Sequence, residues 1–206
     1  MRGRDLTVIK LGGSHAFAPH LADWIEAIAR LAGRIVLVPG GGPFADAVRD
    51  AQTRMGFDDG AAHHMALLAM EQYGCALASG RKQFSLADSR AAIDRALISK
   101  QVPVWLPTRT VLASEIPASW DVTSDSLAAW LAEKIGARRL LLVKHGQPSG
   151  GTARVPELVA RGIVDAAFPR FLPASRIATF VLGPADHATM PEIISGKSTG
   201  TRIEAC

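Results

Sequence analysis

The sequence predicts an α/β protein in which helices cover both faces of a mostly parallel sheet. Short apolar strands alternate with helical patterns along almost all of the 206 residues. Two of these strands, at residues 7–11 and 34–38, run directly into glycine-rich turns. Parallel strands need long crossover connections, which are usually helices, so this alternation is typical of the class.

The elements follow one another in a regular order. Helices are predicted where apolar residues recur every three or four positions, as they do between residues 21 and 31. Pro43 suits the first turn of one helix, and Asp88 or Ser89 caps another. Residues 145–155 are rich in Gly, Pro and Ser and are predicted as a loop. We predict helices at 19–31, 43–54, 59–79, 89–99, 123–135 and 156–161, and strands at 7–11, 34–38, 102–106, 139–144, 177–182 and 201–204.

Length and composition indicate one globular domain over residues 1–206, with a weak internal boundary near residues 117–121. Apolar residues make up 48% of the chain, which is enough for one sizeable core. No apolar run reaches the roughly 20 residues of a membrane span, and the first residues lack a signal-peptide pattern. The two cysteines do not suggest a disulfide framework. We therefore expect a cytoplasmic protein without a membrane partner.

The charge pattern favours small anionic ligands over nucleic acid. The net charge is +4, the basic residues are scattered, and only 6% of the residues are aromatic. A nucleic-acid surface needs a basic patch or stripe. We therefore expect no nucleic-acid partner.

The glycine-rich turns predict a site for a phosphate chain. Ligands of such sheets bind at the carboxyl ends of the strands, where both turns lie. Lys10 ends the first strand, and Gly12, Gly13 and Ser14 follow it. A lysine at a strand end often only reaches toward solvent, but here the glycines allow a ligand to approach the backbone. The second turn, residues 40–42, has three glycines where one would be enough for a tight turn.

A polar segment opens the helix at residues 123–135. Thr123 or Ser124 suits the N-cap, and capping by itself explains a polar residue at this position. Asp125 lies in the first turn, where its carboxylate could also orient a lysine across a cleft.

Two further motifs are weaker. Residues 195–199 resemble the end of a Walker A loop, but Pro191 stands where that motif needs glycine. Lys197 therefore stays only a candidate phosphate contact. His63 and His64 are adjacent on a helix, so they point about 100° apart and cannot form an i, i+4 metal pair. We predict no metal site, assign His63 to the substrate pocket as a candidate, and place Met65, Leu67, Leu68 and Met70 in the core.

Taken together, these motifs resemble the amino acid kinase superfamily, and the resemblance covers nearly the whole chain. The short length and three further segments are similar to the branch that phosphorylates [5-(aminomethyl)furan-3-yl]methyl phosphate, a methanofuran precursor of C1 metabolism. The superfamily motifs are residues 10–14, 38–42, 123–126, 140–144 and 200–203, and the branch segments are residues 63–74, 120–126 and 164–169.

The resemblance implies a three-layer α/β/α sandwich that transfers a phosphoryl group from ATP with Mg²⁺. About residues 1–118 would bind the acceptor and about residues 119–206 the nucleotide, and a homodimer is a family expectation. Lys10 would stabilise the transferring group and Asp125 would orient the catalytic lysine. The remaining residues that it implies are Gly12, Gly13, Lys144, Gly146 and Lys197 toward the nucleotide, and Ser14, Gly40, Gly41, Gly42, His63 and Ser124 toward the acceptor.

The chain departs from the family pattern at two places. Lys144, His145 and Gly146 stand where many relatives have an Asp, and the Gly-Gly-Met segment with a second catalytic lysine is missing. Lys144 or Lys197 would have to replace that lysine. We therefore predict an ATP-dependent kinase of a small phosphorylated acceptor. A kinase of a carboxylate such as an amino acid, or a non-catalytic nucleotide-binding or anion-binding protein, stays an alternative.

Overall fold

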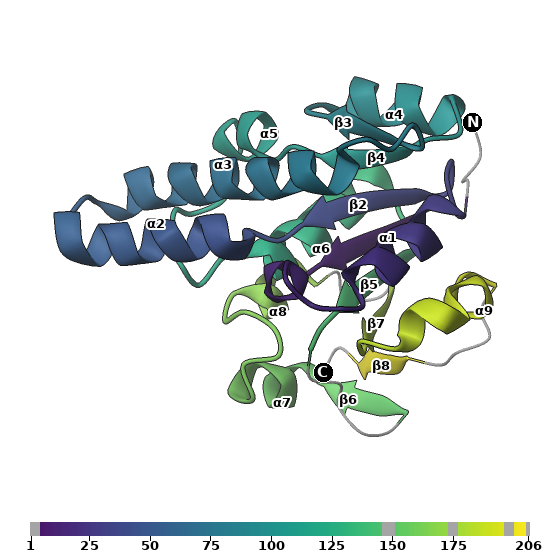
Figure 1. Ribbon diagram of the computed structural model, residues 1–206. Coiled ribbons are helices and arrows are strands. Elements are labelled where there is room, and N and C mark those ends of the chain that lie inside the picture. The colour runs from purple at the N-terminus through teal and green to yellow at the C-terminus, as the bar shows by residue number, and fades with distance from the viewer. Residues whose placement is uncertain (1–4, 146–150, 173–176, 196–199, 205–206) are drawn as a thin grey trace.

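The fold is built on one eight-stranded sheet, seen in a computed structural model that describes residues 5–145, 151–172, 177–195 and 200–204 (Figure 1). The strands are β1 Thr7–Leu11, β2 Ile35–Pro39, β3 Phe84–Ala87, β4 Val102–Trp105, β5 Arg139–Val143, β6 Thr152–Arg154, β7 Ala178–Leu182 and β8 Thr201–Glu204. Their order in the sheet is β3-β4-β2-β1-β5-β7-β8-β6. All neighbours are parallel except β7 and β8, so the predicted fold class is confirmed.

Helices cover both faces of the sheet. They are η1 Gly13–His15, α1 Leu21–Ala29, α2 Gly42–Met55, α3 Asp59–Ala78, α4 Arg90–Ile98, α5 Thr108–Leu112, α6 Ser124–Ile135, α7 Val155–Ala160, α8 Phe168–Phe171, η2 Asp186–Thr189 and α9 Met190–Ile194. The core on one face includes apolar residues of α1, α9 and the end of α3, and the core on the other includes residues of α4, α6, α7 and α8. The longest helices, α2 and α3, form a pair that projects beyond the carboxyl ends of the strands (Figure 1).

The alternation of side chains along β1 decides where Lys10 points. Ile9 and Leu11 belong to the core beneath α1, whereas Val8 belongs to the core beneath α6. Successive side chains of a strand point to opposite faces, so Lys10 shares the face of Val8. Lys10 therefore extends toward α6.

Several short elements lie outside the predictions. β3 was not expected because its four residues include the half-exposed Ser85 and the exposed Leu86, which break the apolar run. β6 lies within the predicted loop at residues 145–155, and it pairs with β8 rather than with a strand near it in sequence. Helices of four or five residues, such as α5, α8 and α9, are too short to show a clear helical period.

The core prediction for α3 was half wrong. Leu67 and Met70 are buried, but Met65 and Leu68 are 38% and 40% exposed. The reason is that α3 projects from the sheet, so only one side of its first half is covered. Along the described ranges, no helix is long and apolar enough to cross a membrane.

Candidate active site

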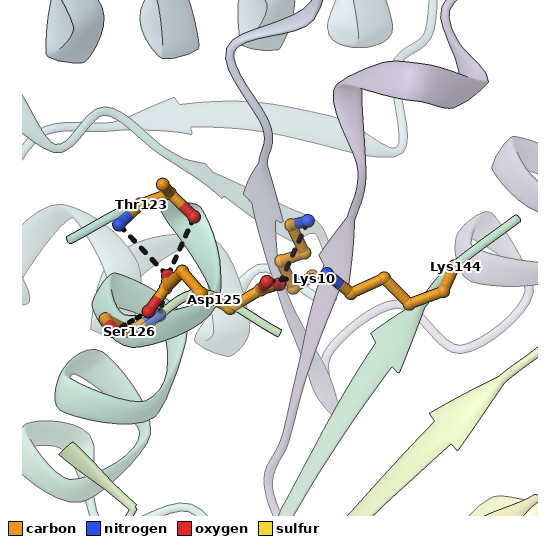
Figure 2. A network of polar contacts seen from close by, with 6 residues as sticks. Lys10, Thr123, Asp125, Ser126 and Lys144 are labelled. Atoms are coloured by element: carbon orange, nitrogen blue, oxygen red, sulfur yellow. Dashed lines mark hydrogen bonds and ion pairs between the residues drawn. The ribbon is translucent and has the colours of Figure 1, made fainter. Parts of the chain in front are cut away.

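Two lysines, the buried Lys10 and the half-buried Lys144, share one carboxylate at the carboxyl ends of β1 and β5. Lys10 Nζ lies 3.0 Å from Asp125 Oδ1, and Lys144 Nζ lies 2.5 Å from Asp125 Oδ2. Figure 2 shows the three side chains meeting between the strands and the first turn of α6. The side chains of Lys10 and Asp125 are 7% and 4% exposed, so solvent screens this pair little.

Strand register explains why the two lysines meet. Lys10 pairs with Leu142 on the neighbouring strand β5. Lys144 follows Leu142 by two positions, so it points to the same face of the sheet as Lys10. Asp125 reaches both lysines because α6 packs on that face and begins with Ser124, at the carboxyl end of the strands.

The charged groups of the cluster shift one another's pKa values. Burial, and then Lys10, lower the pKa of Lys144, whereas Asp125 and Asp165 raise it, and the net result is a pKa of about 8. Burial alone would raise the pKa of Asp125, but the two ammonium groups hold it below its ordinary value. Asp125 is therefore ionised at neutral pH, and with both lysines protonated the cluster carries one positive charge in excess. Such a buried excess favours an anionic ligand.

A second carboxylate holds the start of α6 in place. Asp165 accepts hydrogen bonds from Thr123 N and Thr123 Oγ1 at 3.0 and 2.7 Å, and from Ser126 N at 3.0 Å and Ser126 Oγ. Thr123 is the N-cap residue, as predicted, but its side chain makes no capping bond of its own. Asp165, about 40 residues away in the sequence, accepts these capping hydrogen bonds instead and thereby fixes the turn that carries Asp125.

The two glycine-rich turns pack directly on each other. A Cβ atom on Gly13 would lie 2.1 Å from Gly42 N, and one on Gly40 would lie 2.4 Å from Gly13 N. Gly42 has a φ of +57°. These glycines are therefore required by the backbone contact itself. The N-cap residue of α2 is Gly41, which has no side chain, so this helix has no side-chain cap from its own N-cap residue. Uncapped N–H groups at a helix N-terminus attract anions.

A cavity of about 280 Å³ opens beside these turns and extends between α2, α3 and the start of α6. Gly13, Gly42 and Ser124 lie in its wall, and Ser124 directly precedes Asp125 in the sequence. Its other lining residues are Ser14, Gly41, Ala45, Asp46, Arg49, Asp59, His63, Ala66, Leu67, Met70, Ser119, Trp120, Val122, Thr123 and Leu127.

Some polar side chains in the cavity wall have partners within the part of the chain that the structure describes, and others do not. His63 is 8% exposed, and among the described residues its Nε2 has no hydrogen-bond partner. Burial and the neighbouring His64 lower the pKa of His63, which keeps the ring neutral. The Arg49 guanidinium lies 4.2 Å from the centre of the Trp120 ring, whose Nε1 donates to Gln52 Oε1 at 2.6 Å.

The structure brings most of the predicted residues to one edge of the sheet. Ser14, Gly13, Gly41, Gly42, His63 and Ser124 line the cavity, and Lys10, Asp125 and Lys144 form the cluster next to it. Gly12 is buried next to Lys10, and Gly40 is buried against Gly13. Gly146 and Lys197 lie outside the described residues. Asp165 was not among the predicted site residues, because its partners are about 40 residues away in the sequence.

Comparison with known proteins identifies the family. The amino acid kinase family matches residues 5–146 of the chain. The chain belongs to the amino acid kinase family. It is therefore an ATP-dependent kinase, in agreement with the expectation from the sequence. A relative with an assigned activity is the [5-(aminomethyl)furan-3-yl]methyl phosphate kinase of Methanocaldococcus jannaschii. It is 23% identical over 202 residues, which cover 92% of this chain and 93% of that protein.

Solved structures confirm that the fold is that of amino acid kinases. Uridylate kinase from Archaeoglobus fulgidus has a TM-score of 0.75 and 20% identity, over 96% of this chain and 99% of that chain. UMP kinase from Bacillus anthracis has a TM-score of 0.69 and 18% identity, over 99% of this chain and 97% of that chain.

Proposed function

We propose that this kinase transfers the γ-phosphoryl group of ATP to a small acceptor that already carries a phosphate, giving a diphosphate. The acceptor that we favour is [5-(aminomethyl)furan-3-yl]methyl phosphate, on the strength of the relative from M. jannaschii. The observation that carries the proposal is the pair of lysines, one buried and one half-buried, that one carboxylate holds next to a cavity lined by the glycine turns.

The lysine pair suits phosphoryl transfer, in which catalysis is mostly positioning and charge stabilisation. An oxygen of the acceptor phosphate attacks the γ-phosphorus, and the bond from that phosphorus to the bridging oxygen breaks, leaving its electron pair on ADP. Lys10 and Lys144 would stabilise the negative charge of the group in transfer, and Asp125 would hold both ammonium groups in place. No general base is needed, because a phosphate acceptor is already an anion.

The residues of the site fit a nucleotide that brings its own Mg²⁺. Proteins often bind Mg²⁺ through one or two carboxylates together with substrate phosphates. Asp125 gives both of its oxygens to ammonium groups, so we assign Mg²⁺ to the nucleotide phosphates rather than to a protein cage. When bound there, Mg²⁺ would neutralise part of the phosphate charge. We place the nucleotide on the half formed by residues 119–206 and the acceptor on residues 1–118.

The cavity changes in polarity along its length in a way that suits the furan acceptor. The glycine turns and the N-terminus of α2 would take the phosphate, and Leu67 and Met70 would contact the ring. Asp46 lies four residues into α2, about 6 Å along the helix from Gly42, and lines the same cavity. Asp46 would there face the amine of the acceptor. Asp59 begins α3 about 16 Å along the helix from Met70, which is beyond the reach of this acceptor.

The deciding experiment measures ADP release and product mass with MgATP and five acceptors. The panel holds the aminomethylfuran phosphate, isopentenyl phosphate, UMP, acetylglutamate and aspartate. We expect turnover with the aminomethylfuran phosphate. Turnover with acetylglutamate or aspartate instead would identify a carboxylate kinase. No turnover with any of the five acceptors, together with measurable ATP binding, would contradict the proposal and favour a non-catalytic binding protein.

Two variants test the amine assignment. Asp46→Asn should raise KM for the aminomethylfuran phosphate about fivefold, the upper size expected of an exposed charge pair, and leave KM for ATP unchanged. Asp50→Asn is the matched control, because Asp50 lies on the same helix as Asp46 but pairs with Arg54 outside the cavity. An unchanged KM in Asp46→Asn would remove the amine assignment. A homodimer and a cytoplasmic location stay predictions, for light scattering and cell fractionation to test.

A further inference from the structure

Three histidines gather beside the lysine cluster, and the proposed reaction does not use them. His15 ends η1, His20 directly precedes α1, and His145 follows Lys144 at the end of β5. One ring nitrogen of each histidine lies within 4.8 Å of the corresponding nitrogens of the other two. His15 is fully buried, His20 is half-buried and His145 is exposed.

The three rings are in direct contact, and one of them also has a backbone partner. His15 Nδ1 and His20 Nε2 lie 2.8 Å apart, so one of the two nitrogens donates a hydrogen bond to the other. His145 Nε2 lies 2.6 Å from the carbonyl oxygen of Ser14. A carbonyl only accepts, so His145 Nε2 carries the proton and Nδ1 keeps its lone pair. A backbone carbonyl that fixes the tautomer in this way is a common outer partner of metal-binding histidines.

We infer that His15, His20 and His145 form a binding site for one divalent transition-metal ion of the Zn²⁺ type. Imidazole nitrogens suit Zn²⁺, Ni²⁺ or Cu²⁺, whereas Mg²⁺ prefers oxygen ligands. Three protein ligands leave one position open in a tetrahedral site. The His145 ring stacks on that of His15 at an interplanar angle of 7°, so it must turn before its Nδ1 lone pair points to the same ion. With metal–nitrogen distances of about 2.0–2.1 Å, ligand nitrogens stand roughly 3.3 Å apart, so His15 Nδ1 and His20 Nε2 must also separate slightly. His20 can allow this, because it lies half-buried before α1.

The position of the site suggests what it does. His15 follows Ser14 in the turn after β1, and His145 follows Lys144 after β5, so a shared metal would tie the two turns together. Lys10 Nζ and the His15 ring both border Gly12, where a Cβ atom would lie 3.3 Å from the first and 3.5 Å from the second, so the site lies beside the Lys10 ammonium group. A metal ion beside these cations would be favoured by an anionic oxygen in its open position, such as hydroxide or a phosphate oxygen.

Metal binding can be measured without ATP or acceptor, so its result does not depend on the proposed reaction. Tag-free protein with Cys75 and Cys206 replaced by serine is titrated with Co²⁺, and the visible absorption of four-coordinate Co²⁺ is followed. Zn²⁺ is titrated in parallel by calorimetry. We expect one ion per chain, and Mg²⁺ at the same concentration should not compete. The serine replacements exclude binding by thiolates.

The variants locate the site. His20→Gln and His145→Gln should each weaken binding at least tenfold, the lower end of the loss seen when even an outer partner is removed. They are preferred to changes at the fully buried His15, which could unfold the protein. His64→Gln is the matched control, because His64 is exposed on α3 and outside the cluster. The inference is overturned if the absorption is absent, if both cluster variants bind as tightly as the parent, or if His64→Gln loses as much affinity as they do. The histidines would then be a hydrogen-bonded pair with a stacked third ring, whose centre lies 4.3 Å from that of His15.

Discussion

Lys144 Nζ lies 2.5 Å from Asp125 Oδ2, although one residue follows β5 and the other lies in the first turn of α6. Lys10 binds the other oxygen of the same carboxylate, so Asp125 couples the two lysines. This geometry favours Lys144 as the replacement for the second lysine that the sequence lacks at its usual place. The same three residues carry the first two predictions.

The activity should fall as the pH rises through about 8. Burial, and then Lys10, lower the pKa of Lys144 to about 8, so the ammonium group loses its proton above that pH and no longer attracts phosphate. The profile of kcat/KM reports this pKa in the free enzyme. Lys144→Arg keeps its charge at all accessible pH values, so its alkaline decline should disappear. A wild-type kcat/KM that stays constant from about pH 7 to about pH 9.5 would contradict this role for Lys144.

Replacement of Lys10 should remove most of the turnover and leave the fold intact. Lys10→Met keeps the length of the buried chain but removes the charge, and we expect kcat to fall about 10²- to 10³-fold, as when one donor to a transition state is lost. Lys82→Met is the control, because Lys82 is exposed and outside the cavity. Circular dichroism checks the fold of both variants. A kcat near that of the wild type would show that Lys10 has another role.

Asp165 should matter for both stability and activity. Asp165→Asn keeps the shape but removes the charge that accepts from Thr123 and Ser126, so the free energy of unfolding should fall by about 1–3 kcal/mol. Because the same turn carries Asp125, kcat should fall as well. Asp121→Asn, an exposed neighbour, should change neither quantity. Urea denaturation measures the first effect, and an unchanged transition midpoint for Asp165→Asn would refute the capping role.

The contact between the two glycine turns predicts a strong dependence on residue size. A Cβ atom on Gly13 would lie 2.1 Å from Gly42 N, and backbone cannot yield as a flexible side chain can. Gly13→Ala should therefore lower the free energy of unfolding by about 1–3 kcal/mol or more. Gly151→Ala is the control, since a Cβ atom there would meet nothing within 4 Å. Equal melting temperatures for the two variants would mean that the turns can separate without loss of folding free energy.

The local elements could be predicted because their signals are local. The apolar runs at β1, β2 and β5, the Pro43 turn and the Ser89 cap of α4 all depend on residues within a few positions of one another. Ser89 accepts a hydrogen bond from Ala92 N, as a cap should. β3 and β6 were not predicted, because their stability comes from neighbouring strands in the sheet and not from an apolar run of their own.

The sequence by itself determined which residues form six of the eight strands and the longer helices, and that Lys10 and the glycines lie at the carboxyl ends of strands. Only the tertiary structure decided that Lys144 meets Asp125, that Asp165 caps α6, and that His145 joins His15 and His20. Periodicity along a chain specifies which face of an element is apolar, because burial repeats with the geometry of that element. It does not specify strand order or register, and these bring together side chains that are up to about 130 residues apart.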